Sequence, residues 1–194
     1  MSAMSDRRRS DVVGAVLAGG SASRMGGDKA GALFEGRPLI DCPLGALASR
    51  IEDVLVVAKA STELPGLPAG AERIDEPEEP RHPATGVLAA LEAASGRPVV
   101  VLSCDLPHAD GRLVDALLAE PAGGSAVIAG VAGGRVQPLV ARYEQAAREG
   151  LEGFDPAFPM TGLALALGAS LVEVQERAAR GVNEPGELEG LSRR

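Results

Sequence analysis

The stretch that decides the fold is Val12-Val13-Gly14-Ala15-Val16-Leu17, which runs directly into Ala18-Gly19-Gly20. A short apolar run that ends in glycines is typical of a strand buried in a parallel sheet. Similar apolar runs recur along the chain, at residues 54–58, 99–102, 126–129, 136–141 and 170–174. The sequence therefore predicts a sheet built from several short, buried strands.

Helical patterns lie between these strands, at residues 43–49, 85–94, 111–119, 143–150 and 161–167. Strands that alternate with helices form βαβ units, and such units build a parallel sheet that is covered by helices on both faces. We therefore predict an α/β fold with a mostly parallel, doubly wound sheet. In such sheets ligands bind beyond the carboxyl ends of the strands.

The length of 194 residues suits one compact domain. Residues 1–10, which carry a short arginine run, are predicted to be a disordered tail, and residues 11–194 a single domain. No apolar run approaches the roughly 20 residues of a membrane span. The two cysteines, Cys42 and Cys104, do not form a disulfide framework, which favours a cytoplasmic protein.

Composition argues against a nucleic-acid partner. The formal net charge is -8, and the chain has no Trp, one Tyr and three Phe. An acidic field repels polyphosphates, and few aromatic rings are available to stack on bases. The acidic cluster between Glu72 and Glu79 is predicted to be a solvated loop, and His82 and His108 are predicted to face solvent.

The loop after the first strand, residues 18–29, combines glycines with Arg24 and Lys29. Glycines let exposed backbone N–H groups approach an anion, and the two cations supply positive charge. The loop lacks the Gly-Lys-Ser/Thr of a Walker loop and the GxGxxG of a dinucleotide fingerprint. It could be a surface loop with solvated cations. The position of glycines, Arg24 and Lys29 directly after the first strand favours a nucleotide site.

Asp105 follows the apolar run at residues 99–102 and precedes Pro107. If this strand lies beside the first strand, Asp105 points into the crevice near the glycine loop. Mg²⁺ prefers oxygen ligands, commonly one or two carboxylates together with phosphates and water. Asp105 is therefore the candidate Mg²⁺ ligand. The alternative is a helix cap, for which Asp110 is better placed.

The motifs Leu17-Ala18-Gly19-Gly20, Ser23-Arg24-Met25-Gly26 and Asp28-Lys29 resemble the signature of the molybdenum cofactor guanylyltransferases. The resemblance implies a Rossmann-like three-layer sandwich that binds GTP with Mg²⁺. It implies transfer of GMP to the phosphate of molybdopterin carrying molybdenum, with release of pyrophosphate. It further implies transient contacts with other molybdenum-cofactor proteins.

The resemblance continues through Cys104-Asp105-Leu106-Pro107 and Val182-Asn183-Glu184-Pro185, nearly to the end of the chain. It assigns catalysis to Arg24, Lys29 and Asp105, and binding of the acceptor to Asn183. It assigns nucleotide binding to Leu17, Ala18, Gly19, Gly20, Lys29, Asp75, Gly86 and Asp105, with the backbone amides of residues 18–20 as a phosphate cradle.

Base choice rests on Gly19, because cytidylyl relatives carry Ala there and a missing Cβ leaves room for a purine. The departures from the family pattern are Gln137 in place of His, Gly181 in place of Asp or Asn, and the segment 158–162, which lacks the usual polar or basic start of a late helix. In addition, the exit of the second strand reads Val57-Ala58-Lys59 where some members carry Asn. Most of these departures lie in the half expected to bind molybdopterin. Two alternatives stay open: a nucleotidyltransferase that acts on another phosphorylated acceptor, and a non-catalytic GTP-binding paralogue.

Overall fold

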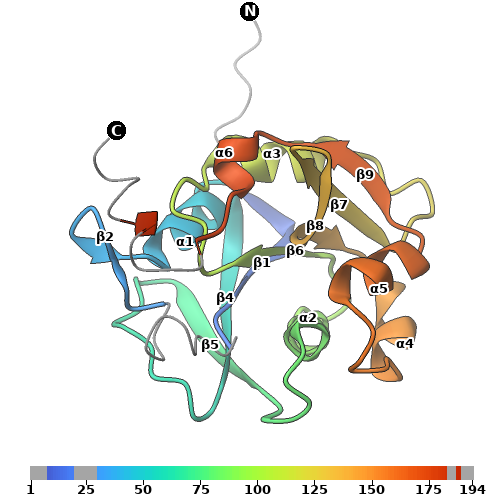
Figure 1. Ribbon diagram of the computed structural model, residues 1–194, viewed down its shortest axis with the longest axis horizontal. Coiled ribbons are helices and arrows are strands. Elements are labelled where there is room, and N and C mark those ends of the chain that lie inside the picture. The colour runs from blue at the N-terminus through green and yellow to red at the C-terminus, as the bar shows by residue number, and fades with distance from the viewer. Residues whose placement is uncertain (1–7, 20–29, 183–186, 189–194) are drawn as a thin grey trace, which may run out of the picture.

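Valine, leucine and alanine dominate the strands of the central sheet because both faces of the sheet are covered. The computed structural model describes residues 8–19, 30–182 and 187–188. Its seven-stranded sheet has the order β5-β4-β1-β6-β8-β7-β9 (Figure 1). The strands are β1 (Arg9–Leu17), β4 (Ile51–Lys59), β5 (Ala71–Glu76), β6 (Val99–Ser103), β7 (Val127–Ala132), β8 (Arg135–Tyr143) and β9 (Ser170–Glu173). Only β8 runs antiparallel to its neighbours, so the prediction of a mostly parallel sheet is confirmed.

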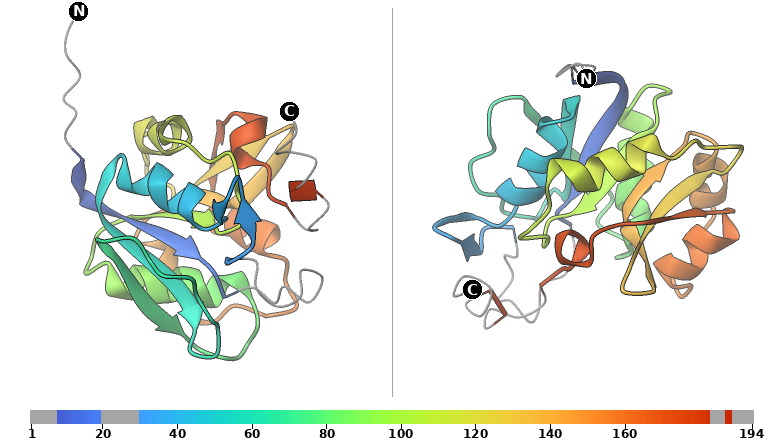
Figure 2. Two further views of the ribbon diagram at one scale, coloured as in Figure 1. Left: turned by 90° about the vertical axis from the view of Figure 1, so that its left-hand side faces the viewer. Right: turned by 90° about the horizontal axis from the view of Figure 1, so that it is seen from above.

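Helices cover the sheet on both sides (Figures 1 and 2). One core cluster joins the sheet to α1 (Asp41–Ala48), α3 (Gly111–Ala119) and α6 (Glu176–Ala179). The other joins the opposite face to α2 (Pro83–Ala93), α4 (Ala147–Glu152) and α5 (Met160–Ala166). The predicted α/β three-layer sandwich is confirmed.

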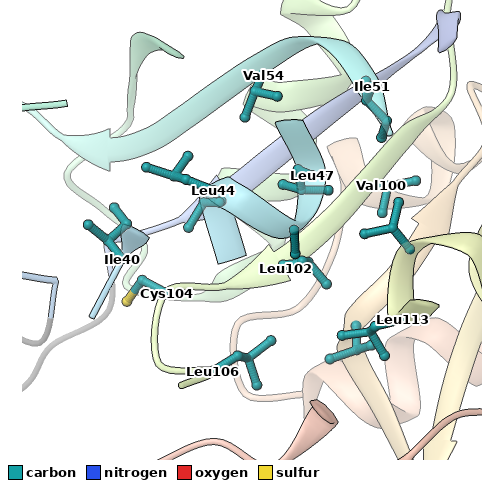
Figure 3. Packing of buried hydrophobic residues seen from close by; sticks show 14 of the residues in the cluster. Ile40, Leu44, Leu47, Ile51, Val54, Val100, Leu102, Cys104, Leu106 and Leu113 are labelled. Atoms are coloured by element: carbon teal, nitrogen blue, oxygen red, sulfur yellow. The ribbon is translucent and has the colours of Figure 1, made fainter. Parts of the chain in front are cut away.

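The alternation of side chains along β1 divides its residues between the two cores. Val12 and Val16 belong to the α1 side, and Val13 and Leu17 to the α2 side. Figure 3 shows leucines of α1 lying over β4 and β6 in the first of these cores. A Cβ on Gly14 would stand 3.2 Å from the Leu47 side chain, so this glycine lets α1 pack closely on the sheet.

A small hairpin of β2 (Leu33–Phe34) and β3 (Arg37–Pro38) leads into α1. Its turn uses positive φ at Glu35 and Gly36, 51° and 80°. Phe34 packs in a third, smaller cluster together with Leu39, Cys42, Val182 and Leu188. The cluster therefore brings residues from near the C-terminus against the hairpin.

Three elements differ from the sequence prediction. β1 begins at Arg9, inside the segment predicted as a tail, because the Arg9 N–H donates to the Arg50 carbonyl. The acidic stretch predicted as a solvated loop contains the edge strand β5, and Glu76 at its end is buried. The helix predicted from Tyr143 begins at Ala147, because Tyr143 still pairs in β8 with Val99 and Val127.

Among the described residues, no helix has the length and apolar character needed to cross a membrane.

Candidate active site

The candidate site lies where β5, β4, β1 and β6 end side by side. Leu17 at the end of β1 pairs in register with Val57 of β4 and with Ser103 of β6. Beyond the strands, the Ala18 N–H donates to the Val57 carbonyl at 2.8 Å, and the Cys104 N–H donates to the Leu17 carbonyl at 3.2 Å. These hydrogen bonds continue the pairing of β1 with β4 and with β6 by one residue beyond the ends of the strands. They place the residues that follow β1 beside those that follow β6, as the Asp105 argument required.

A cavity of about 260 Å³ opens at this edge of the sheet. Its wall is formed by Leu17, Gly19, Lys59, Glu76, Arg81, His82, Pro83, Ser103, Cys104, Asp105 and Leu139. The cavity therefore runs from the end of β5, with Glu76, to the segment after β6, with Asp105. Of the predicted site residues, the structure brings Leu17, Gly19 and Asp105 together here.

Two charged side chains form the β5 end of the cavity. Lys59 and Glu76 are cross-strand partners at the ends of β4 and β5, and their side chains are only 8% and 6% exposed. The Lys59 Nζ lies 3.7 Å from Glu76 Oε1 and donates to the Pro77 carbonyl at 2.6 Å. The Thr85 hydroxyl lies 2.6 Å from Glu76 Oε2. A buried ion pair of this kind needs such hydrogen bonds to offset its desolvation.

Two glycines leave the space that the Glu76 carboxylate occupies. A Cβ built on Gly19 would stand 1.8 Å from Glu76 Oε1, and one on Gly86 would stand 3.1 Å from Oε2. The missing Cβ at Gly19 therefore makes room for a protein carboxylate, whereas the sequence argument expected it to make room for a purine. Gly86 lies in the first turn of α2, behind Glu76.

Two other predicted nucleotide residues are placed differently from expectation. Asp75 points to the opposite side of β5 from Glu76, and its carboxylate, 58% exposed, pairs with Arg73 at 3.0 Å. The Ala18 N–H is already bonded to Val57, so it does not contribute to the predicted phosphate cradle. Gly20, Arg24, Lys29 and Asn183 lie outside the described residues.

Sequence reasoning missed Glu76 because its neighbours read as an acidic loop. The available signal was positional, since Glu76 is the last residue of an alternating segment and faces the strand exit that carries Lys59. Lys59 enters the sequence analysis only as part of the strand exit Val57-Ala58-Lys59, which departs from the family pattern. Taken together, a Lys and a Glu at the exits of adjacent strands indicate a polar wall.

Asp105 lies on the boundary between the first cavity and a second one of about 670 Å³. Ser103 and Leu139 also belong to both walls. The segment after α6 lies beside Asp105, because the Val182 N–H donates to the Asp105 carbonyl at 3.0 Å. Asp105 can therefore contact groups bound in either cavity.

The second cavity is larger and carries its own cations. Arg135 and Arg180 line it together with Gln137, Pro138 and Glu176. Behind the wall, the Tyr143 hydroxyl donates to the Pro138 carbonyl at 2.9 Å. Burial raises the pKa of Tyr143, so this hydroxyl stays protonated and keeps its role as donor.

The residues around Asp105 suit a hard divalent cation. The Asp105 carboxylate lies against the Gly181 backbone, since a Cβ there would stand 3.0 Å from Oδ1. The neighbouring Ser103 adds a hydroxyl oxygen to the same wall. Within the described residues, no group of three or more His, Cys, Asp or Glu side chains is arranged to hold a metal ion. Sites for Mg²⁺ commonly combine one or two carboxylates with phosphate oxygens of the substrate, and Asp105 fits that pattern.

His82 was predicted to face solvent, but its ring makes contacts within the protein. It lines the first cavity and caps α2, with its Nδ1 accepting from the Ala84 N–H at 3.1 Å. Its Nε2 lies 3.2 Å from the Phe158 carbonyl, and its ring lies 4.7 Å from that of Phe154. His82 thus connects the start of α2 to the segment before α5.

Residues 14–156 match the MobA-like NTP transferase domain. The chain belongs to this family. The match spans the glycine loop, both strand exits and Asp105, so the resemblance predicted from the loop motifs is confirmed.

Among curated relatives of this MobA-like chain is the molybdenum cofactor guanylyltransferase of Cereibacter sphaeroides. It is 35% identical over 146 residues, which are 71% of this chain and 72% of that protein. The probable molybdenum cofactor guanylyltransferase of Bacillus licheniformis is 31% identical over 67% of this chain and 67% of that protein. The molybdenum cofactor guanylyltransferase of Rhizobium leguminosarum bv. trifolii is 35% identical over 68% of this chain and 62% of that protein.

Solved structures share the fold. Molybdopterin-guanine dinucleotide biosynthesis protein A from Archaeoglobus fulgidus superposes with a TM-score of 0.66 at 20% identity, covering 93% of this chain and 97% of that one. The 2-C-methyl-D-erythritol 4-phosphate cytidylyltransferase from Thermus thermophilus gives 0.65 at 23% identity, covering 93% and 98%. The same architecture is therefore present in proteins named for different bases and acceptors.

Proposed function

We propose that this MobA-like chain is a molybdenum cofactor guanylyltransferase, which transfers GMP from GTP to the phosphate of molybdopterin and releases pyrophosphate. The observation that carries the proposal is the position of Asp105 between two cavities at the carboxyl edge of the sheet. A transferase needs a nucleotide and an acceptor to meet at one charge-neutralising group, and this arrangement provides such a point.

The mechanism needs no protein nucleophile. A phosphate oxygen of the acceptor attacks the α-phosphorus of GTP, a P–O bond forms, and the bond to the pyrophosphate leaving group breaks. Catalysis then consists of positioning the reactants and neutralising charge. GTP occupies the first cavity and the acceptor the second, so that the two react beside Asp105. Arg24 and Lys29 stabilise charge on the phosphates.

We assign Asp105 as the protein ligand of a divalent metal, and Mg²⁺ as that metal. When bound, Mg²⁺ neutralises charge on the phosphate oxygens. The Gly181 backbone lies close to the Asp105 carboxylate and restricts its orientation, and Ser103 lines the same wall.

The second cavity supports an anionic acceptor of substantial size. Its volume of about 670 Å³ lies within the usual range for small-molecule sites. Arg135 and Arg180 offer planar guanidinium groups that suit phosphate oxygens. Asn183 follows directly after Val182, whose backbone bonds to Asp105, and we assign Asn183 to acceptor binding on that basis.

The proposal places the reaction in the cytoplasm, because both Cys42 and Cys104 are buried thiols. Its partners are GTP and a molybdopterin-type substrate, with transient contacts to other molybdenum-cofactor proteins. The alternative is that the acceptor is another phosphorylated compound. It is supported by Gln137 and Gly181, which line the second cavity and depart from the family pattern.

The test measures pyrophosphate release from purified protein with Mg²⁺. We expect release only when GTP and the molybdopterin cofactor are both present, and little release with CTP or ATP. Release with GTP and a different phosphorylated acceptor would replace the proposed substrate. GTP binding without release in any combination would favour the non-catalytic alternative.

Asp105→Asn should reduce turnover by about a hundredfold or more, as loss of one preorganised charge does. Asp115→Asn is the matched control, because Asp115 is an exposed carboxylate of α3 that pairs with Arg50 at 2.7 Å. Turnover of Asp105→Asn close to that of the control would remove Asp105 from the mechanism.

A further inference from the structure

The two edges of the central sheet differ in how they are protected. In the sheet order of the described residues, β5 and β9 are the edge strands. The exposed positions of β5 carry Glu72, Arg73 and Asp75, and charges on an edge discourage a second chain from pairing with it. β9 reads Ser-Leu-Val-Glu, its one charge is at its last residue, and Leu171 is 51% exposed. The β9 edge is therefore open to another strand.

The backbone of β9 directs hydrogen-bonding groups at this open edge. β9 pairs in parallel with β7, and the Val174 N–H just beyond it donates to the Val131 carbonyl. Within a strand the N–H and C=O groups of one residue point to the same side, and successive residues alternate. Because Val172 and Val174 face β7, the N–H and C=O groups of Leu171 and Glu173 point outward.

The segment that leads through α5 into β9 contains no charged side chain. Residues 156–172 are the longest uncharged run of the sequence, in a chain of which 24% of the residues are charged. Within this run, Phe158 and Leu165 are 45% and 48% exposed. A Cβ on Gly162 would stand 3.0 Å from the Phe158 ring, so this ring lies on α5 about one turn before Leu165.

Leu171 lies on the same side of the sheet as these apolar residues. Val172 packs in the core cluster of α1, α3 and α6, whereas Ala169 packs in that of α2, α4 and α5. Since alternate residues of a strand share a face, Leu171 faces the α5 side together with Ala169. Figure 1 shows α5 and β9 next to each other at one margin of the molecule. Phe158, Leu165 and Leu171 define what we call the α5–β9 surface.

We propose that the α5–β9 surface binds a second copy of this chain, with the two β9 strands paired antiparallel about a two-fold axis. The inference does not depend on the proposed function. An axis perpendicular to the sheet pairs an edge strand with its own copy and keeps both α5 helices on one side. With Leu171 opposite its copy, the outward N–H and C=O groups of both residues form a hydrogen-bonded pair. Glu173 then stands opposite Ala169 of the second copy, so no like charges face each other.

The charge of the chain favours this surface over the others for self-association. Each copy has a formal net charge of -8, so two copies repel each other as whole molecules. A surface without charged side chains adds no local repulsion and requires no ion to be desolvated. Because salt screens the remaining repulsion, the dimer should become tighter as the ionic strength rises.

Sedimentation equilibrium of the full chain tests the proposal. Wild-type protein should dimerise at about 100 µM, and more tightly as NaCl is raised from about 50 to about 500 mM. Leu171→Lys should raise the dissociation constant by about tenfold or more, because like charges then face each other across the axis. Leu33→Lys is the matched control, since Leu33 of β2 is 66% exposed and lies outside the α5–β9 surface. The control should associate as the wild type does.

Mixing Leu171→Lys with Leu171→Glu tests the register. Each variant alone should be mostly monomeric, and the equimolar mixture should dimerise, because opposite charges then face each other across the axis. Association regained in the mixture cannot arise from misfolding.

Three results would each overturn the inference. They are a monomeric wild type at every concentration, equal association of Leu171→Lys and Leu33→Lys, and a mixture that stays monomeric. None of them bears on pyrophosphate release, so the proposed function can stand or fail separately.

Discussion

Gly181 determines how closely the chain passes the Asp105 carboxylate. A Cβ at this position would stand 3.0 Å from Oδ1, 3.3 Å from Cγ and 3.4 Å from Oδ2. Contacts this short oblige the carboxylate to rotate or the segment to move by a few tenths of an ångström. The side chain that the family usually carries here would therefore require a different arrangement of Asp105.

Gly181→Ala should lower kcat by about ten- to a hundredfold, because small displacements of a positioned catalytic group have effects of that order. Thermal stability should change little, since Gly181 is not at a positive φ. Gly66→Ala is a suitable comparison, because a Cβ there would meet nothing within 4 Å. Equal kcat in the two variants would show that Asp105 tolerates the added methyl group.

The N-cap residue of helix α2 is a histidine, His82, which is an unusual residue at this position. His82 has extended dihedral angles, φ −139° and ψ 141°, and supplies a ring nitrogen where most helices use a hydroxyl or carboxylate oxygen. The same ring reaches Phe154 and the Phe158 carbonyl. One side chain therefore fixes both the start of α2 and its junction with the segment before α5.

His82→Ala should reduce the free energy of unfolding by about 1 kcal/mol or somewhat more, because the cap and the ring contacts are both lost. His82→Asn should recover the cap, since its amide oxygen can accept from the Ala84 N–H, and should leave a smaller deficit. Urea unfolding of the three proteins measures the difference. If Asn were no more stable than Ala at this position, the cap would contribute nothing.

The elements that sequence reasoning predicted well are those buried on both faces. Residues 54–58 and 99–102 read as continuous apolar runs because β4 and β6 lie inside the sheet between other strands. β5 is an edge strand with the sequence Ala-Glu-Arg-Ile-Asp-Glu, and its exposed positions carry charges that also suit a loop. The pattern that identifies a strand is therefore weakest at the edge of the sheet.

The candidate site shows the same division. Asp105 was predictable because it follows a buried strand that lies beside β1. Glu76 was not, because its surroundings depend on Lys59 and Thr85, which meet it through the pairing of β4 with β5 and the packing of α2. The local signal for Glu76 is only its place at the end of β5, which does not by itself show what the side chain contacts.

For the molecule as a whole, the cations at the sheet edge stand against an acidic background. The formal net charge is -8, yet Lys59 and Arg81 line the first cavity and Arg135 and Arg180 the second. A general negative field repels polyphosphates from the rest of the surface. The first wall also carries Glu76 and Asp105, and the second Asp105 and Glu176, so the described cations offset the carboxylates of the two cavities.

The dependence of stability on pH should involve His108, which follows β6 and packs against the hairpin of β2 and β3. Its ring meets Phe34 of the hairpin edge to face, with centroids 5.5 Å apart. No hydrogen-bond partner for the buried Nε2 is found among the described residues. Burial lowers the pKa of His108 from its ordinary value, the charge of Arg177 lowers it further, and Glu35 acts in the opposite direction. The folded protein therefore favours the neutral ring.

The sign of the effect follows from proton binding. Below about pH 6.5 the unfolded chain takes up the His108 proton more readily than the folded protein does, so stability falls as the pH falls through this range. Above pH 7 the His108 ring is neutral in both states, so its titration costs no stability. The loss of stability grows as the pH falls, until the pH passes below the folded-state pKa of His108. His108→Gln removes it while keeping a polar side chain of similar size. Between pH 7.5 and 5.5, the melting temperature of wild-type protein should therefore decrease more than that of the variant. Parallel decreases would mean that the His108 ring is protonated equally well in both states.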